Sequence, residues 1–78
     1  MTKRRVLEIF ATHAQWMTPD EIRIRLQGNR QRSSVYSYLF RLHQQQGLLE
    51  RGERSGRIVY RISAKGGERL AFFRSRDR

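Results

Sequence analysis

Cysteine is absent from this 78-residue chain. Disulfide bridges and the thiolate zinc motifs that hold many small domains together are therefore both excluded. Long apolar runs are also lacking, because none approaches the roughly 20 residues that span a bilayer. The N-terminal segment is basic, and Glu8 interrupts the place where a signal peptide would have its apolar centre. We therefore expect a cytoplasmic protein.

Acidic residues are scarce as well. Seven aspartates and glutamates stand against seventeen lysines and arginines, which gives a formal net charge of +10. Such a surplus repels itself in a compact body and favours a polyanionic partner, although a generally basic, solvated surface would have the same composition. Lysine occurs only as Lys3 and Lys65. The remaining cations are arginines, which form bidentate bonds to phosphates and guanine edges as lysine cannot.

Apolar residues recur at three- and four-residue spacing in three segments, which is typical of helices with one buried face. We expect helices over 3–14, 19–27 and 31–46, and the short apolar segment 15–17 could pair as a brief strand. The second helix has the clearest start, a capping box from Thr18 to Glu21 with a proline at the first helical position. Glycines mark the ends of the second helix, at 28–29, and of the third, at Gly47.

After Gly47 the apolar period changes to two residues, as in strands. We expect a hairpin over 48–62 whose turn, 53–56, contains a glycine. Ser63 then caps a last helix over 64–74, with Leu70 and Phe73 on its inner side, followed by a frayed tail. Gly66 and Gly67 lie in the first turns of this helix, where each costs about 1 kcal/mol relative to alanine. All of these elements fit in a single domain, residues 1–78.

This order of elements is that of a winged helix-turn-helix domain, a mainly α fold with a small β-hairpin. The segment 17–22 resembles the entry to the second helix of bacterial and archaeal winged-helix regulators. The segments 33–42 and 47–51 resemble their recognition helix and first wing strand, and 59–66 is similar to the junction before the last helix in PadR-like and MarR-like proteins. The resemblance implies a third helix in the DNA major groove. Arg23, Phe40 and the lack of long dimerising helices depart from the family pattern.

The candidate DNA-binding residues lie in three places. Counting 100° per residue puts serines and arginines opposite the apolar stripe of the third helix. Because no acid lies between Glu21 and Glu50, we expect this exposed face of the helix to be free of acidic residues. The candidates on or beside this helix are Arg30, Arg32, Ser33, Ser34, Tyr36, Ser37 and Arg41. Those of the wing are Arg54, Ser55 and Arg57, and those of an N-terminal arm are Lys3, Arg4 and Arg5. Each set could instead be ordinary solvated surface, and Tyr36 could be partly buried.

No active site is recognisable. His13 and His43 show no metal-ligand pattern, and the acids Asp20 and Glu21 are explained by the start of a helix, so we expect no catalysis, metal or cofactor. Trp16 is expected to pack in the core or against the hairpin.

We predict a sequence-specific double-stranded DNA-binding protein, a transcriptional regulator that is nucleoid-associated if prokaryotic. The alternatives are an RNA or nucleoprotein binder and a winged helix used for protein association. Surplus aromatic residues predict a homodimer through Phe40 and Phe72.

Overall fold

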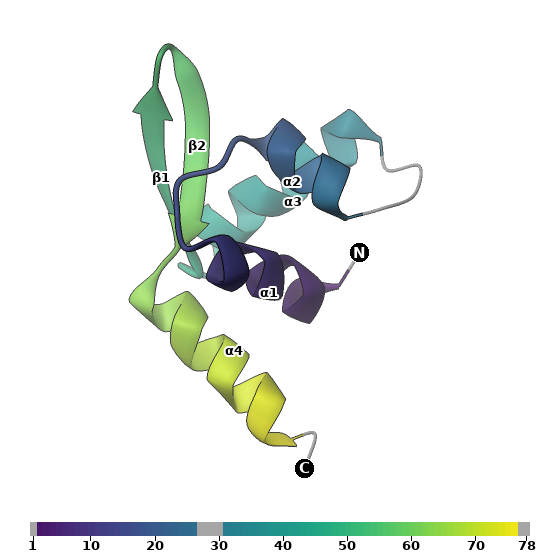
Figure 1. Ribbon diagram of the computed structural model, residues 1–78, viewed down its shortest axis with the longest axis vertical. Helices are drawn as coiled ribbons and strands as arrows, with labels where there is room; N and C mark the ends of the chain where they lie inside the picture. Colours follow the sequence, from purple (N-terminus) through teal and green to yellow (C-terminus); the bar gives the residue numbers. More distant parts are fainter. Residues whose placement is uncertain (1, 27–30, 77–78) are drawn as a thin grey trace.

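The computed structural model describes residues 2–26 and 31–76. This part of the chain forms four helices and a two-stranded antiparallel sheet (Figure 1). In chain order the elements are α1 (Lys3–His13), α2 (Pro19–Arg25), α3 (Arg32–Gln44), β1 (Leu49–Arg54), β2 (Arg57–Ile62) and α4 (Ala64–Arg76). The hairpin projects from the helices at one end of the molecule, and α4 extends at the other. The predicted class, mainly α with a small hairpin, is confirmed.

Local capping sets most element boundaries. The Oγ of Thr18 accepts a hydrogen bond from the Glu21 N–H at 3.2 Å, and the Glu21 carboxylate accepts one from the Thr18 N–H at 3.1 Å, which confirms the capping box. Beyond α3, Gly47 has a φ of +66° and donates its N–H to the His43 carbonyl, as predicted for a terminating glycine.

Other boundaries differ from the predictions. Helix α2 ends at Arg25 with Leu26 as its C-cap, earlier than the expected stop at 28–29, and residues 28–29 themselves lie outside the described residues. Helix α3 ends at Gln44, two residues earlier than predicted, and α4 continues to Arg76, so the prediction of a frayed tail from Arg74 was wrong over 74–76. Packing of α4 against α1 stabilises the longer helix, and arginines in its last turn interact favourably with the helix dipole.

One core joins the helices to the hairpin. Its buried members are Val6, Leu7, Ile9, Phe10, Met17, Ile22, Leu26, Val35, Leu39, Leu42, Leu48, Leu49, Tyr60 and Leu70. Phe73 is partly buried against them. The helical residues of this core follow the three- and four-residue spacing seen in the sequence, which located the inward faces of the helices. Ala14, which the same spacing placed on the inward stripe of the first helix, is instead exposed beyond the end of α1. No helix within residues 2–26 and 31–76 combines the length and the apolar character needed to cross a membrane.

The connection between α1 and α2 is held to the hairpin. Met17 and Tyr60 exchange two backbone hydrogen bonds, of 2.9 and 2.8 Å, so the expected brief strand exists as a single bridge. The neighbouring Trp16 packs on the hairpin, since a Cβ at Gly52 would lie 3.1 Å from its ring and the Arg61 guanidinium lies 4.4 Å from its ring centre. The prediction that Trp16 packs against the hairpin is confirmed. Together these contacts fix the base of the hairpin beside the helices.

The turn of the hairpin has the predicted position. Arg54 and Arg57 are cross-strand partners, and the two residues between them, Ser55 and Gly56, have φ values of 52° and 75°. Two successive positive φ values are the pattern of a type I′ turn, which suits the twist of an antiparallel pair. The turn therefore carries an arginine on each side of its tip.

Candidate nucleic-acid interface

The exposed side of α3 carries most of the candidate residues. Val35, Leu39 and Leu42 are buried and fix the rotation of this helix about its axis. Eight residues on the remaining surface are exposed: Arg32, Ser33, Ser34, Tyr36, Ser37, Phe40, Arg41 and Gln44. Arg30 lies outside the described residues. Because serine side chains are short, the backbone of α3 can approach another molecule closely along this side.

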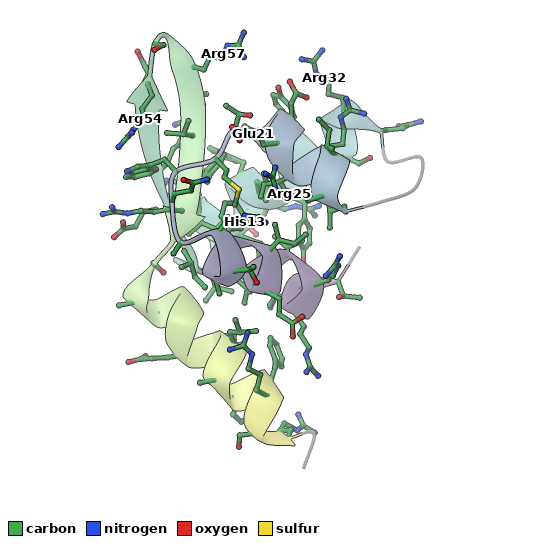
Figure 2. All side chains as sticks on the ribbon, in the orientation of Figure 1. His13, Glu21, Arg25, Arg32, Arg54 and Arg57 are labelled. Atoms are coloured by element: carbon green, nitrogen blue, oxygen red, sulfur yellow. The ribbon has the colours of Figure 1, made fainter. Side chains whose placement is uncertain are left out.

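Helix α3 and the hairpin border one hollow. It has a volume of about 410 Å³ and is lined by Thr18, Pro19, Asp20, Arg32, Tyr36, Gly56, Arg57, Ile58 and Tyr60. Arg32 and Arg57, distant in sequence, therefore border the same space. Figure 2 shows Arg57 on the side of the hairpin that faces α2, whereas Arg54 extends from the other side. The fold thus places Arg32 and Arg57 on the lining of one hollow, which Arg54 does not reach.

Asp20 contributes an acid to this hollow. Its carboxylate accepts hydrogen bonds from Nε and Nη2 of Arg32, at 3.0 and 2.7 Å, and from the Tyr36 hydroxyl at 3.3 Å. Arg23 lies 3.6 Å from the same carboxylate. The hydrogen bond from Arg32 is the largest cause that holds the pKa of Asp20 below its ordinary value.

The prediction of an acid-free face was therefore wrong. Asp20 belongs to α2, but α2 packs against α3 and places this carboxylate beside Arg32, twelve positions further along the chain. The sequence explained Asp20 only as a favourable acid in the first turn of a helix. No local pattern pointed to the second role, because it depends on how two helices pack.

Tyr36 lies on the exposed side rather than in the core. Its side chain is 42% exposed, and its ring centre lies 5.8 Å from the Arg32 guanidinium. Of the two alternatives that the sequence left open, the structure favours exposure. The ring and hydroxyl of Tyr36, together with Asp20, fix the position of Arg32.

Among the described residues, no carboxylate pairs with the remaining candidate arginines of α3 and the hairpin, Arg41, Arg54 and Arg57. Arg41 and Arg54 instead lie near aromatic rings, at 6.0 Å from Tyr38 and 5.9 Å from Trp16. Arg57 is exposed, and so is Ser55 at the tip of the turn. These guanidinium groups are available to an anionic partner without first breaking an ion pair.

The N-terminal cations do not form an arm. Thr2 caps α1, because its Oγ accepts a hydrogen bond from the Arg5 N–H at 3.2 Å, so Lys3, Arg4 and Arg5 form the first helical turn. Arg4 also pairs with Glu8 at 3.0 Å. This local cap holds the three residues in α1 rather than in a separate arm, and their contact with DNA stays a prediction. In Figure 1 this end of α1 is the one farther from the hairpin.

The exposed aromatic residues have separate surroundings. Phe40, on α3, lies 6.0 Å from the guanidinium of Arg51 in β1. Phe72, on α4, lies 6.1 Å from the Phe73 ring and 5.6 Å from the Arg76 guanidinium. The structure therefore does not bring the two predicted dimer residues into one contact.

Ile58 belongs to the exposed surface, which the sequence analysis did not predict. Its alternation with Tyr60 and Ile62 suggested an inward side chain, yet it is 41% exposed. It lines the hollow beside α3 and a second one with His43, Arg51, Gly52 and Glu53. The hairpin projects beyond the helices here, so strand alternation alone does not bury this residue.

Both histidines have structural contacts. Arg25 Nε donates to His13 Nε2 at 3.2 Å, and His43 Nδ1 lies 3.0 Å from the Leu49 carbonyl oxygen. In the part of the chain that the structure describes, no cluster of three or more histidine and acidic side chains could hold a metal ion.

No protein-family model, curated protein or solved structure matches the chain. The charge and geometry of the hollow are therefore what indicate a function.

Proposed function

We propose that the protein is a winged-helix domain that binds double-stranded DNA in a sequence-specific manner, as a transcriptional regulator. The observation that carries this proposal is the pair of arginine-bearing walls, α3 and the hairpin, around one hollow in a chain of charge +10. Such a clustered positive surface is the electrostatic footprint of a nucleic-acid-binding protein. Winged-helix topology is supported by the element order and by the isolated Met17–Tyr60 bridge, which ties the segment between α1 and α2 to β2 of the hairpin.

Helix α3 is the element proposed to enter the major groove. An α-helix with its side chains is about 10–12 Å wide, and the major groove of B-DNA is about 12 Å wide. The short Ser33, Ser34 and Ser37 side chains allow a close approach, and Arg41 is long enough to reach a base edge. On this geometry the hairpin would contact the backbone or the minor groove with Arg54, Ser55 and Arg57, since arginine is favoured in a narrow minor groove.

The first test is the salt dependence of binding to a labelled duplex, measured by fluorescence anisotropy. If about five phosphates are neutralised, the slope of log K against log salt should be about −4 to −5. Arg57→Ala should make this slope shallower by about 1. Arg69→Ala removes the same charge from an exposed site on α4 and is the matched control. A flat salt titration, or equal effects of the two variants, would contradict the proposal.

The second test separates base contacts from backbone contacts by selection from a random duplex library. Ser37→Ala or Arg41→Ala should change the preferred sequence, with a cost of roughly 1–3 kcal/mol where a base contact is lost. Arg54→Ala or Arg57→Ala should weaken all sequences more evenly. Identical sequence profiles for all four variants would refute this division of roles.

RNA is the competing ligand in the same assay. The deep, narrow major groove of an A-form duplex does not admit a helix, so α3 could not read double-stranded RNA in the proposed way. We expect duplex DNA to bind more tightly than duplex or single-stranded RNA at equal salt. Tighter binding of either RNA would assign the basic surface to that ligand instead.

A further inference from the structure

The Arg32 side chain is held in place by Asp20 and Tyr36 beside an exposed surface. Nε and Nη2 donate to the two carboxylate oxygens of Asp20, at 3.0 and 2.7 Å, in a bidentate pair. The Tyr36 hydroxyl bonds to the same carboxylate, and its ring centre lies 5.8 Å from the guanidinium. These contacts come from both α2 and α3, so the plane of the guanidinium is fixed by the packing of the two helices.

The pairing with Asp20 engages only one side of the Arg32 guanidinium. A guanidinium has five N–H donors, and Asp20 takes one on Nε and one on Nη2. Both N–H groups of Nη1 and the second of Nη2 remain, and 67% of the side chain is exposed. One N–H of Nη1 and the remaining N–H of Nη2 lie side by side in the guanidinium plane and form a pair of the kind that binds two acceptors at once.

Two acceptor pairs in duplex DNA fit such an edge: O6 and N7 of guanine, and two oxygens of a phosphate. Asp20 distinguishes between them. Its negative charge repels a phosphate but acts far less on a neutral base, and it reduces the positive potential that would attract an anion to Arg32. Fixing the arginine before binding also lowers the entropy that is lost when it contacts a base.

We propose that Asp20 is a positioning residue that makes Arg32 a reader of guanine rather than a phosphate contact. This inference rests on the proposed DNA-binding function. It places a specificity-determining pair at the start of α3, where the exposed guanidinium edge adjoins the serine-lined side of the helix.

Removal of Asp20 has one expected effect if only net charge matters and a different one if Asp20 positions Arg32. By charge alone, removal of an acid from a cationic surface strengthens binding to all sequences evenly. If Asp20 positions Arg32, Asp20→Ala removes the preference for guanine at one position of the site, whatever happens to overall affinity. Base preference therefore separates the two effects.

The test is selection from a random duplex library, with affinities then measured for the selected site and for its three single-base replacements. Wild type should prefer guanine at one position, and Asp20→Ala should reduce that preference by at least about fivefold. Arg32→Lys keeps the charge but lacks the paired guanidinium donors, so it should remove the guanine preference at the same position. Tyr36→Phe removes only the hydroxyl that bonds to Asp20 and should weaken the guanine preference in part. Because Tyr36 is exposed and its charge does not change, this variant should fold normally, so misfolding would not explain the loss.

The matched control is Glu53→Ala, which removes the same charge from an exposed position of the hairpin. It should tighten binding evenly and leave the guanine preference intact. Unchanged base preference in Asp20→Ala and Arg32→Lys, or a wild type without the guanine preference, would overturn the inference while leaving DNA binding in place. Failure of wild type to bind any duplex would overturn both proposals.

Discussion

Replacement of Gly66 by alanine tests how α4 is attached to the rest of the domain. Gly66 is buried, and a Cβ there would overlap the carbonyl oxygen of Leu48 and lie 2.8 Å from Cγ1 of Ile62. The Leu48 oxygen is not free to move away, because it accepts a hydrogen bond from the Ser63 N–H at 3.1 Å. The added methyl must therefore displace backbone as well as a side chain.

Three effects determine the expected change in the unfolding free energy of Gly66→Ala. Alanine is favoured over glycine in a helix by about 1 kcal/mol. Overpacking costs about 1–3 kcal/mol, and weakening the hydrogen bond to Leu48 costs about 1 kcal/mol. The net loss for Gly66→Ala is about 2 kcal/mol, which lowers Tm by roughly 8–16 °C in a domain of this size. Thermal and urea unfolding followed by circular dichroism would measure it.

The adjacent Gly67 is the matched control. It is exposed, and a Cβ there would meet nothing within 4 Å. Gly67→Ala should therefore raise the unfolding free energy, by up to about 1 kcal/mol, through helix propensity alone. If the two substitutions changed Tm in the same direction, the role assigned to Gly66 would be wrong.

Three further predictions concern the core, Asp20 and self-association. Leu39→Ala, at a fully buried site, should lower the urea-unfolding free energy by about 2–5 kcal/mol, whereas a loss under about 1 kcal/mol would contradict the packing described. Because the folded pKa of Asp20 is lowered, its stabilisation is present above its ordinary pKa and is lost as pH falls through the folded pKa. The Tm difference between wild type and Asp20→Asn, measured from neutral to acidic pH, should therefore diminish on acidification, and a constant difference would refute this. We also predict a homodimer on a two-fold site with half-sites about one helical turn apart, to which Phe40 and Phe72 contribute surface. Sedimentation showing a monomer both free and on DNA would exclude it.

Local signals in the sequence determined the elements and the inward faces of the helices. Thr18 and Glu21 cap α2 through residues three positions apart, and Gly47 ends the turn after α3 through bonds to residues close in the chain. The two-residue turn at Ser55 and Gly56 is equally local. These interactions need only neighbouring residues, so the sequence alone could predict them.

Contacts between elements were decided by the tertiary structure. The sequence could show that α3 is cationic, but Asp20 reaches Arg32 only because α2 and α3 pack together. Likewise, Gly66 and Gly67 are equivalent by helix propensity, and only the position of the Leu48 carbonyl distinguishes them. The physical reason is the same in both cases. Helix periodicity specifies which side of an element faces inward, whereas the atom it meets there depends on the position and orientation of another element.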